Sequence, residues 1–541
     1  MAVPNHRLAA AGALAACLAL AVLHTWPLAT APGVLSRHDN ADAMLNEWIV
    51  AWVAHQAPRD PLRLFEANIF HPEPRALAFS EHMTVQGLMG APAAWLGAPP
   101  LLVYNLLVLA GLALSAWSMW LLLWRWTGSR AAGAIAGTLV AFNAHTLTRL
   151  PHLQALHLEF LPAVLLALDR VLVERRTRDA LLLGVACALQ GLTSSYLLVF
   201  TFLAVAAGIA VRAGDVRRPA PARTAALLGL AAGIGAVLVA PFLYPYYLTQ
   251  QAQGLTRSLD EVALYSSTWR DYLATAGRLH YAAWSHRFLD GATALFPGGA
   301  ALALTAVALA SRPGLRDARI RMAAAIGAAG VALSFGPALP GYATLYQWVP
   351  ILQGVRGAAR FGFLALMAVA VLAGFGAAAL RARWGARAWW PVLAAALFVL
   401  VNVEALRAPL AFRPFDGIPR IYQSLRDPSV RAVAEFPFFR AEDVLRNAPY
   451  VLNSTAHWKP IVNGYSGFVP RSYPAIADAL RPFPGGASEA ELRRLGVTHV
   501  VVHLDGYGSR AGEMASALSA TAWLALVASE RDIRVYRVAT F

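Results

Sequence analysis

The first carboxylates and histidines that could do chemistry lie in a polar stretch after the first apolar run of the chain. Asp39 and Asp42 stand at its start, with Glu47 and His55 further on. A carboxylate in such a place can take a proton from a hydroxyl group as a general base, or bind a cation. If the chain is helical from Asp42, Glu47 and His55 lie on related but not identical faces of that helix. The alternative is that Asp39 or Asp42 only caps a helix.

The same polar stretch later carries Glu81 and His82, directly before an apolar segment. These two side chains either line a binding pocket at a membrane interface or are simply solvated at that boundary.

A second polar segment comes after the third apolar run. It holds His145, Arg149, His152, His157 and Glu159. His152, His157 and Glu159 are of types that ligate metals, although their spacing matches neither HExxH nor a zinc finger. Hydrogen bonding to a polar substrate and plain interfacial solvation are equally open. A divalent cation is therefore a candidate cofactor, and no cofactor is certain.

Two arginines, Arg356 and Arg360, lie in the glycine-containing run from 353 to 361, at the start of another apolar segment. Glycine lets the backbone approach a ligand closely, and guanidinium groups suit phosphate oxygens. The site predicted here would hold a lipid phosphate. The alternative is that the arginines snorkel to headgroups.

Composition places all these residues in a membrane protein. The 541 residues are 58% hydrophobic and only 14% charged, whereas soluble domains are about 25% charged. A transmembrane helix needs about 20 apolar residues. About eleven spans are predicted, some of them short, near 9–29, 98–124, 131–147, 155–173, 179–194, 196–212, 224–247, 293–311, 321–338, 360–381 and 388–408.

Arginine predicts the orientation of these spans. Alternate short loops are almost purely basic, which is typical of cytoplasmic loops. They contain Arg125, Arg130, Arg175, Arg176, Arg178, Arg212, Arg217, Arg218, Arg223, Arg312, Arg316, Arg319, Arg321, Arg381, Arg383 and Arg387. The N-terminus with Arg7 falls on the same side. It also resembles a signal peptide with a cleavage site near 29–31, and the polar stretch after it lies outside in either case.

Three outer segments are too long to be turns: 30–97, 248–292 and the tail. We therefore predict a membrane domain over 1–409 and a soluble periplasmic α/β domain over 410–541. The tail predicts buried strands at 430–436 and 497–504, a helix opened by a capping box at Ser488–Glu491, a second helix over 511–528 and a strand over 533–538. It contains no P-loop, GxGxxG or nucleophile elbow, so a lid or recognition role is expected.

The net charge of +15 does not indicate a nucleic-acid partner, because the basic residues recur in short loops instead of gathering on one face. Cys17 and Cys187 both lie inside apolar runs and predict neither a disulfide framework nor a metal site.

The layout as a whole resembles the GT-C superfamily of membrane glycosyltransferases, nearest to its YfhO-like and mannosyltransferase-like bacterial members. Asp39 and Asp42 fit the acidic position of the first outer loop in that class. Three further stretches look like recurring segments of these relatives: 149–162, Arg356–Phe361 and the tail motif Asn463–Phe468. Two features depart from the class: the acidic pair is spaced DxxD, not DxD, and the WWDYG motif is missing. The resemblance therefore specifies neither the substrate nor a metal requirement.

The resemblance implies a polytopic inner-membrane enzyme that uses a polyprenyl-phosphate-linked sugar donor and a glycan, lipid or protein acceptor. It implies that Asp39 or Asp42 is the base, and that Arg356 and Arg360 hold the departing lipid phosphate. A transporter or flippase for lipid-linked glycans, and a non-catalytic scaffold, are the competing hypotheses. No clear internal repeat supports transport.

Overall fold

The computed structural model describes residues 6–217, 219–291 and 293–539. Arg218, one of the predicted cytoplasmic arginines, lies outside these ranges. The chain divides into two compact units. Unit 1 comprises 1–31, 105–242 and 256–411, and unit 2 comprises 32–104, 243–255 and 412–541.

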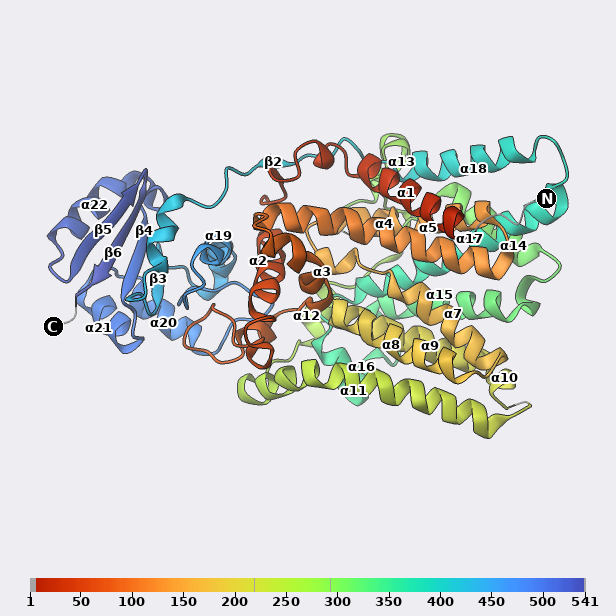
Figure 1. Cartoon of the computed structure of the whole chain (residues 1–541), viewed down its shortest axis with the longest axis horizontal. Coiled ribbons are helices and arrows are strands. Elements are labelled where there is room, and N and C mark those ends of the chain that lie inside the picture. Colours follow the sequence, from red (N-terminus) through yellow and green to blue (C-terminus); the bar gives the residue numbers. More distant parts are fainter. Residues whose placement is uncertain (1–5, 218, 292, 540–541) are drawn as a thin grey trace. The chain divides into compact units, whose positions relative to one another are not determined.

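Unit 1 is helical, and its long helices run alongside one another (Figure 1). The long and short helices of unit 1 are α1 (His6–His24), α4 (Pro100–Thr127, from Asn105 onwards), α5 (Arg130–Ala141), α6 (Ala144–Thr148), α7 (Phe160–Val173), α8 (Thr177–Thr193), α9 (Ser195–Val211), α10 (Ala213–Arg217), α11 (Pro221–Gln253, up to Phe242), α12 (Leu259–Leu264), α13 (Arg278–Ala283), α14 (Gly299–Ala310), α15 (Ala318–Ser334), α16 (Tyr342–Trp348), α17 (Gly362–Trp384) and α18 (Trp390–Ala405). Each predicted apolar span overlaps one of these helices, so the polytopic helical fold is confirmed.

The number of membrane crossings stays a prediction. Within the described part of the chain, four helical segments are both long and apolar enough to span a bilayer: His6–His24, Pro100–Thr127, Pro221–Gln253 and Ala358–Trp384. Three shorter apolar helices, Ser195–Val211, Gly299–Ala310 and Trp390–Ala405, accompany them.

Helix α17 is the centre of unit 1 and packs against α5, α14 and α15. Small residues make this close packing feasible, as is usual between membrane helices. A Cβ atom on Gly376 would lie 1.9 Å from the carbonyl oxygen of Leu304, so only glycine permits the observed approach of α17 to α14.

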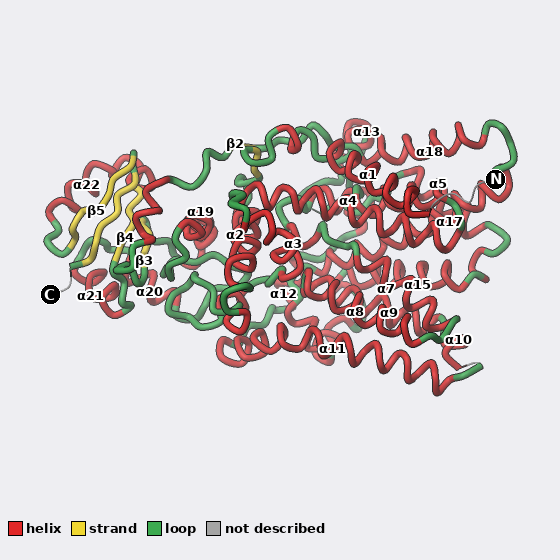
Figure 2. The backbone as a smooth tube through the Cα atoms, in the orientation of Figure 1, coloured by secondary structure: helices red, strands yellow, loops and turns green. Residues whose placement is uncertain are grey.

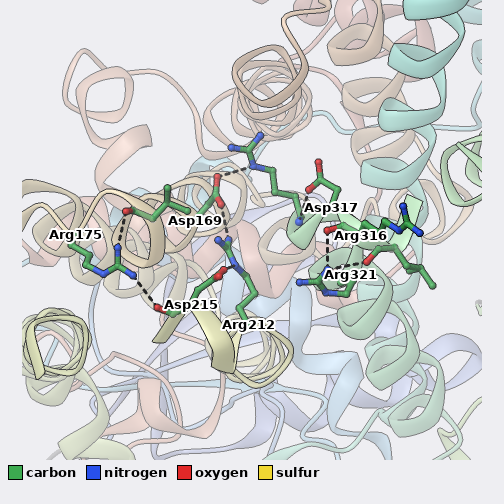
Figure 3. Close-up of polar contacts among 10 residues, drawn as sticks. Asp169, Arg175, Arg212, Asp215, Arg316, Asp317 and Arg321 are labelled. Carbon is green, nitrogen blue, oxygen red and sulfur yellow. Dashed lines mark hydrogen bonds and ion pairs between the residues drawn. The ribbon is translucent and has the colours of Figure 1, made fainter. Parts of the chain in front are cut away.

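Buried charges join the helix ends of unit 1 that carry the predicted cytoplasmic arginines. Asp169 on α7 accepts hydrogen bonds from Arg212 (2.6 Å) and from Arg319 (2.9 Å), and Arg212 also pairs with Asp215 at 2.8 Å (Figure 3). The sequence predicts Arg212 in a cytoplasmic loop, yet only 2% of its side chain is exposed. Its role is therefore to connect α7, α9 and α10 rather than to face solvent.

Unit 2 combines the first long loop with the tail of the chain. Its helices are α2 (Ala41–Gln56), α3 (Thr84–Trp95), α19 (Ala448–Asn453), α20 (Tyr473–Leu480), α21 (Gly486–Arg494) and α22 (Ala511–Ala520). Strands β1 (Leu35–Ser36) and β2 (Arg413–Pro414) pair antiparallel, so the start of the first loop is joined to the start of the tail.

The tail forms a small α/β sheet, as predicted (Figure 2). The strand order is β3 (Val433–Phe436), β4 (His499–His503), β6 (Ile533–Val538), β5 (Leu524–Glu530), with β3 and β4 parallel and the other neighbours antiparallel. Every residue of β3 is buried. A short, mostly apolar run of this kind is typical of a strand covered on both faces, which is why the sequence predicts it.

Two details of the predicted tail are wrong. The predicted helix over 511–528 ends at Ala520, and Leu524–Glu530 instead pairs with β6 as an edge strand, joined by a turn in which Arg531 has φ 52°. The predicted capping box at Ser488 does not form, because α21 already begins at Gly486. The Ser488 hydroxyl donates to the carbonyl of Gly485 at 2.6 Å.

Candidate functional site

The acidic candidates of the first loop lie around the N-terminus of α2 in unit 2. Asn40 caps this helix, because its side chain accepts a hydrogen bond from the backbone N–H of Asp42 at 2.9 Å. The alternative interpretation of Asp39 or Asp42 as the helix cap is therefore wrong. Both carboxylates are left for other contacts.

Asp39 is hydrogen-bonded to a neighbouring arginine. Arg37 donates two hydrogen bonds to it, at 3.0 and 3.1 Å, and the Asp39 side chain remains 34% exposed. These hydrogen bonds and the guanidinium charge hold the pKa of Asp39 below its usual range. Asp39 is thus an ionised, partly exposed carboxylate at neutral pH.

Asp42 has a partner far away in the sequence. The hydroxyl of Tyr465 donates to Asp42 Oδ1 at 2.5 Å. Tyr465 belongs to the tail segment Asn463–Phe468, whose backbone is bonded to the first loop: Phe70 N–H donates to the Asn463 carbonyl, and Phe468 N–H donates to that of Phe79. The tail motif thus positions a tyrosine on one of the two candidate bases.

A third carboxylate of the loop is fully buried. Glu47 is 1% exposed, burial raises its pKa, and its Oε2 lies 2.8 Å from Nε2 of His38. Its Oε1 atom is buried and makes no hydrogen bond within the described structure. We call the following set the acidic group: Arg37, His38, Asp39, Asp42, Glu47 and Tyr465. Sequence reasoning alone assigns no site role to Arg37, His38 or Tyr465.

The other predicted residues of the first loop have structural surroundings of their own. His55 lies at the far end of α2, about 20 Å along the helix from Asp42. It stacks on Trp458 with ring centroids 4.3 Å apart, and burial lowers its pKa to about 4. His82 is buried, its Nδ1 accepts from the backbone N–H of Thr84 at 3.2 Å, and burial lowers its pKa to about 4 as well. Glu81 beside it is half-buried.

In unit 1 the structure gathers four of the predicted binding residues. His145 on α6 is buried, and its ring experiences the charges of Arg149, Arg360 and His152. Its Nδ1 atom is buried without a hydrogen bond in the described structure. These residues come from α6, the turn after it and the segment before α17, so the fold brings together positions up to 215 apart in sequence (145 to 360).

The arginines before α17 rest on tyrosine faces. The guanidinium carbon of Arg360 lies 4.2 Å from the ring centre of Tyr196, and that of Arg356 lies 4.8 Å from the ring centre of Tyr265. Neither arginine takes part in an ion pair within the described residues. A Cβ atom on Gly357 would lie only 3.3 Å from Nε of Arg360, so this glycine makes room for the guanidinium.

A further arginine joins from the second outer loop. Arg257 donates to Glu261 at 2.9 Å and is close enough to Arg356 and Tyr196 to interact with them electrostatically. Burial is the main cause that lowers its pKa. We call the following set the arginine group: His145, Arg149, His152, Tyr196, Arg257, Tyr265, Arg356 and Arg360. Sequence reasoning misses Tyr196, because it stands inside an apolar run.

The side chains of His157 and Glu159 contact each other. The Nδ1 atom of His157 lies 2.9 Å from Glu159 Oε1, and its Nε2 lies 3.2 Å from the carbonyl oxygen of Leu107. Both ring nitrogens are thus engaged within the protein. Across the part of the chain that the structure describes, no three His, Cys, Asp or Glu side chains are grouped so that they could hold a metal ion.

Comparisons with known proteins find similarity at the level of structure only. No family model matches the chain, and no curated protein matches it in sequence. Several solved structures are similar over most of its length, two of which follow. The archaeal oligosaccharyltransferase AglB from Archaeoglobus fulgidus, in complex with an inhibitory peptide and a dolichol-phosphate, is 13% identical with a TM-score of 0.46, and the alignment covers 99% of this chain and 75% of that one.

ArnT from Cupriavidus metallidurans, bound to undecaprenyl phosphate, is likewise 13% identical with a TM-score of 0.46. The alignment covers 91% of this chain and 96% of that one. Similarity at this low identity concerns the fold alone.

Proposed function

We propose that this protein is an integral-membrane glycosyltransferase that moves a sugar from a polyprenyl-phosphate-linked donor to an acceptor on the outer face of the inner membrane. The observation that carries the proposal is the arginine group. Arg356 and Arg360 are held by aromatic faces and have no carboxylate partner within the described residues. Cation–π contacts hold a guanidinium without using its N–H groups, which stay available to an anion such as phosphate.

The like charges of the arginine group also favour an anionic ligand. The guanidinium groups of Arg257 and Arg356 are close enough to interact, and those of Arg149 and Arg360 both act on the ring of His145. Like charges at short range destabilise the folded state unless a counter-ion is present. A lipid phosphate would supply that negative charge at the depth where polar helix ends meet the headgroup region.

The acidic group supplies the proposed base. The acceptor hydroxyl oxygen forms a bond to the anomeric carbon of the sugar, and the bond from that carbon to the phosphate oxygen breaks. Asp39 or Asp42 takes the hydroxyl proton. The polyprenyl phosphate leaves as an anion, which Arg356 and Arg360 stabilise by charge-assisted hydrogen bonds. The proposed acceptor is a glycan, lipid or protein hydroxyl, and the tail of the chain would cover it.

The proposal includes the orientation predicted from arginine: the first loop and the tail face the periplasm. Reporter fusions at the C-terminus test this part directly. A cytosolic tail would overturn the proposal, because the acidic group would then face the compartment of the arginine-bearing turns.

The activity is tested with membranes that contain the wild-type chain, Asp39→Asn or Asp42→Asn, incubated with polyprenyl-phosphate sugars and an extract of envelope acceptors. We expect loss of a general base to lower sugar transfer by about 10²- to 10⁴-fold. Arg287→Gln, an exposed change in the second outer loop, serves as the control. Unchanged transfer in both aspartate variants, at normal protein level, would favour a transporter or a scaffold.

A further inference from the structure

A surface hollow of unit 1 lies between the start of α8 and the start of α11. It has a volume of about 530 Å³ and is lined by Arg176, Thr177, Arg178 and Arg223. All four residues are exposed, so the hollow opens at the surface. Its size is within the range of small-ligand sites, about 300–1,000 Å³. Three of the four lining side chains carry a positive charge.

The walls of the hollow are fixed by Arg175, which itself does not line it. This residue has a left-handed backbone, with φ 51°, and its guanidinium donates to the Thr224 hydroxyl at 3.0 Å. It also donates to the carbonyl oxygen of Asp215 at 3.0 Å (Figure 3). In return Arg223 donates through Nε to the Arg175 carbonyl at 3.0 Å. The turn between α7 and α8 is thereby fastened to the beginning of α11.

Few negative charges balance the hollow. Arg176 pairs with Glu174, but the ion pairs among the described residues include neither Arg178 nor Arg223. Asp179, in the first turn of α8, is buried and lies 3.8 Å from Arg170. The cavity therefore keeps an excess of positive charge.

The hollow contains donors other than guanidinium groups. Thr177 contributes a hydroxyl and is the first residue of α8, a helix of 17 residues. A phosphate group with several acceptor oxygens matches such a mixture of guanidinium and hydroxyl donors.

The position along the helices identifies the source of this phosphate. Arg223 lies in the first turn of α11, a helix apolar enough to span a bilayer. A charged residue at the end of a spanning helix is at headgroup depth. The same helix ends carry the arginines that predict the cytoplasmic side, where anionic lipids are concentrated.

From these observations we infer that the hollow binds the phosphate of an anionic glycerophospholipid headgroup of the cytoplasmic leaflet. The site would anchor the α7–α8 turn to the membrane surface. This inference shares its membrane orientation with the proposed function but is independent of sugar transfer, since it concerns lipid binding by residues outside both the acidic and the arginine group.

The test measures lipid binding to the full chain in detergent. The probes are dioctanoyl phosphatidylglycerol, dioctanoyl phosphatidylcholine and inorganic phosphate, measured by native mass spectrometry and calorimetry. We expect the anionic lipid to bind at least about tenfold more tightly than the zwitterionic one, because the arginines repel the choline ammonium of phosphatidylcholine and phosphatidylglycerol has no such cation. The double variant Arg178→Gln/Arg223→Gln should lose at least about tenfold in affinity for phosphatidylglycerol.

The matched control is Arg383→Gln/Arg387→Gln, which removes the same charge from exposed positions around the C-terminal end of α17. It should leave the affinity within about twofold, and both double variants should keep the wild-type unfolding temperature within a few degrees. Equal losses in the two double variants would overturn the inference, because net charge alone would then explain binding. Inorganic phosphate that displaces the lipid at equal concentration would also overturn it, since the hollow would then be a site for free phosphate.

Discussion

The hydroxyl of Tyr465 donates a hydrogen bond to Asp42 at 2.5 Å, although 423 positions separate the two residues in the chain. Removing this hydroxyl with Tyr465→Phe leaves the carboxylate without that donor. Because hydrogen bonds to charged groups contribute about 1.5–3 kcal/mol, we expect the variant to lose stability on that order. The free energy of unfolding of the detergent-solubilised chain, measured by denaturant titration, checks this.

A double-mutant cycle isolates the pair. Asp42→Asn should reduce the cost of Tyr465→Phe, giving a coupling energy of about 1 kcal/mol between the two positions. Additive effects of the two substitutions would mean that the contact contributes nothing to stability.

Such a pair cannot be predicted from one sequence. The acidic loop and the tail motif are each identifiable, the first by carboxylates after an apolar run and the second by its resemblance. Nothing in their spacing says that Tyr465 lies on Asp42, because that contact depends on the backbone pairing of Asn463 with Phe70 and of Phe468 with Phe79. Long-range contacts of this kind arise from tertiary packing alone.

Asp39 and Arg37 predict a pH dependence. Their pairing holds the pKa of Asp39 below its usual range, so Asp39 stays ionised and able to accept a proton down to acidic pH. Replacing Arg37 by Gln removes the cause and should raise that pKa towards the ordinary value of about 3.9. If Asp39 is the base, the acid limb of the pH–rate profile of sugar transfer moves to higher pH in the variant.

The Arg37–Asp39 pair stabilises the folded state only at a pH at which Asp39 is ionised. A carboxylate with a lowered pKa contributes stability above its unfolded-state pKa, and this contribution is lost as pH falls through the folded-state value. Arg37→Gln should therefore lower the unfolding temperature slightly at pH 7 and have no effect near about pH 2. A variant equally destabilised at both pH values would show that Arg37 acts by packing and not by charge.

His82 and His55, like Asp39, make the folded state less stable as pH falls, but they do so at higher pH. Burial lowers the pKa of each to about 4, so the folded state resists their protonation while the unfolded chain binds protons near about pH 6.5. Their contribution to stability is complete above about pH 6.5 and falls as pH decreases towards 4. For fully buried His82 the loss at pH 5 is on the order of 2 kcal/mol.

His82→Asn keeps a side-chain acceptor for Thr84 but does not titrate. The difference in unfolding temperature between pH 7 and pH 5 should thus shrink in this variant and stay unchanged in His286→Asn, which alters an exposed histidine. An unaltered pH difference in His82→Asn would show that His82 is not protonated on unfolding in this range.

Arg360, which lies on the face of Tyr196, is expected to contribute to donor binding. Arg360→Gln removes the charge, so affinity for a polyprenyl phosphate should fall about tenfold or more. Arg360→Lys keeps the charge but loses the planar fork and should recover only part of the affinity. Binding of a short-chain prenyl phosphate measured by calorimetry checks both, with Arg287→Gln as the control. A value for Arg360→Gln within twofold of wild type would remove this residue from the proposed phosphate site.

Much of unit 1 is predictable because long apolar runs have few alternatives to a helix in lipid. The tail is harder. The stretch 521–528 is rich in alanine and leucine and favours a helix, but its pairing with β6 overrides that local preference. Likewise the arginines of the short basic loops predict an orientation, whereas the burial of Arg212 depends on Asp169, a carboxylate within a predicted span whose partners hydropathy alone does not indicate.

The stability of unit 1 is expected to depend on Asp169 and its two arginine partners. The carboxylate is almost fully buried and accepts from Arg212 and Arg319, so its removal leaves a buried guanidinium without its counter-ion. Breaking a buried ion pair from one side costs about 3–5 kcal/mol. Asp169→Ala should accordingly lower the amount of folded protein in membranes and its unfolding temperature strongly. Arg319→Gln should cost far less, because its side chain is 34% exposed and Arg212 still neutralises Asp169. Similar losses in both variants would mean that Arg319, which also lies over the ring of Trp126, is held more by its aromatic contact than by the carboxylate.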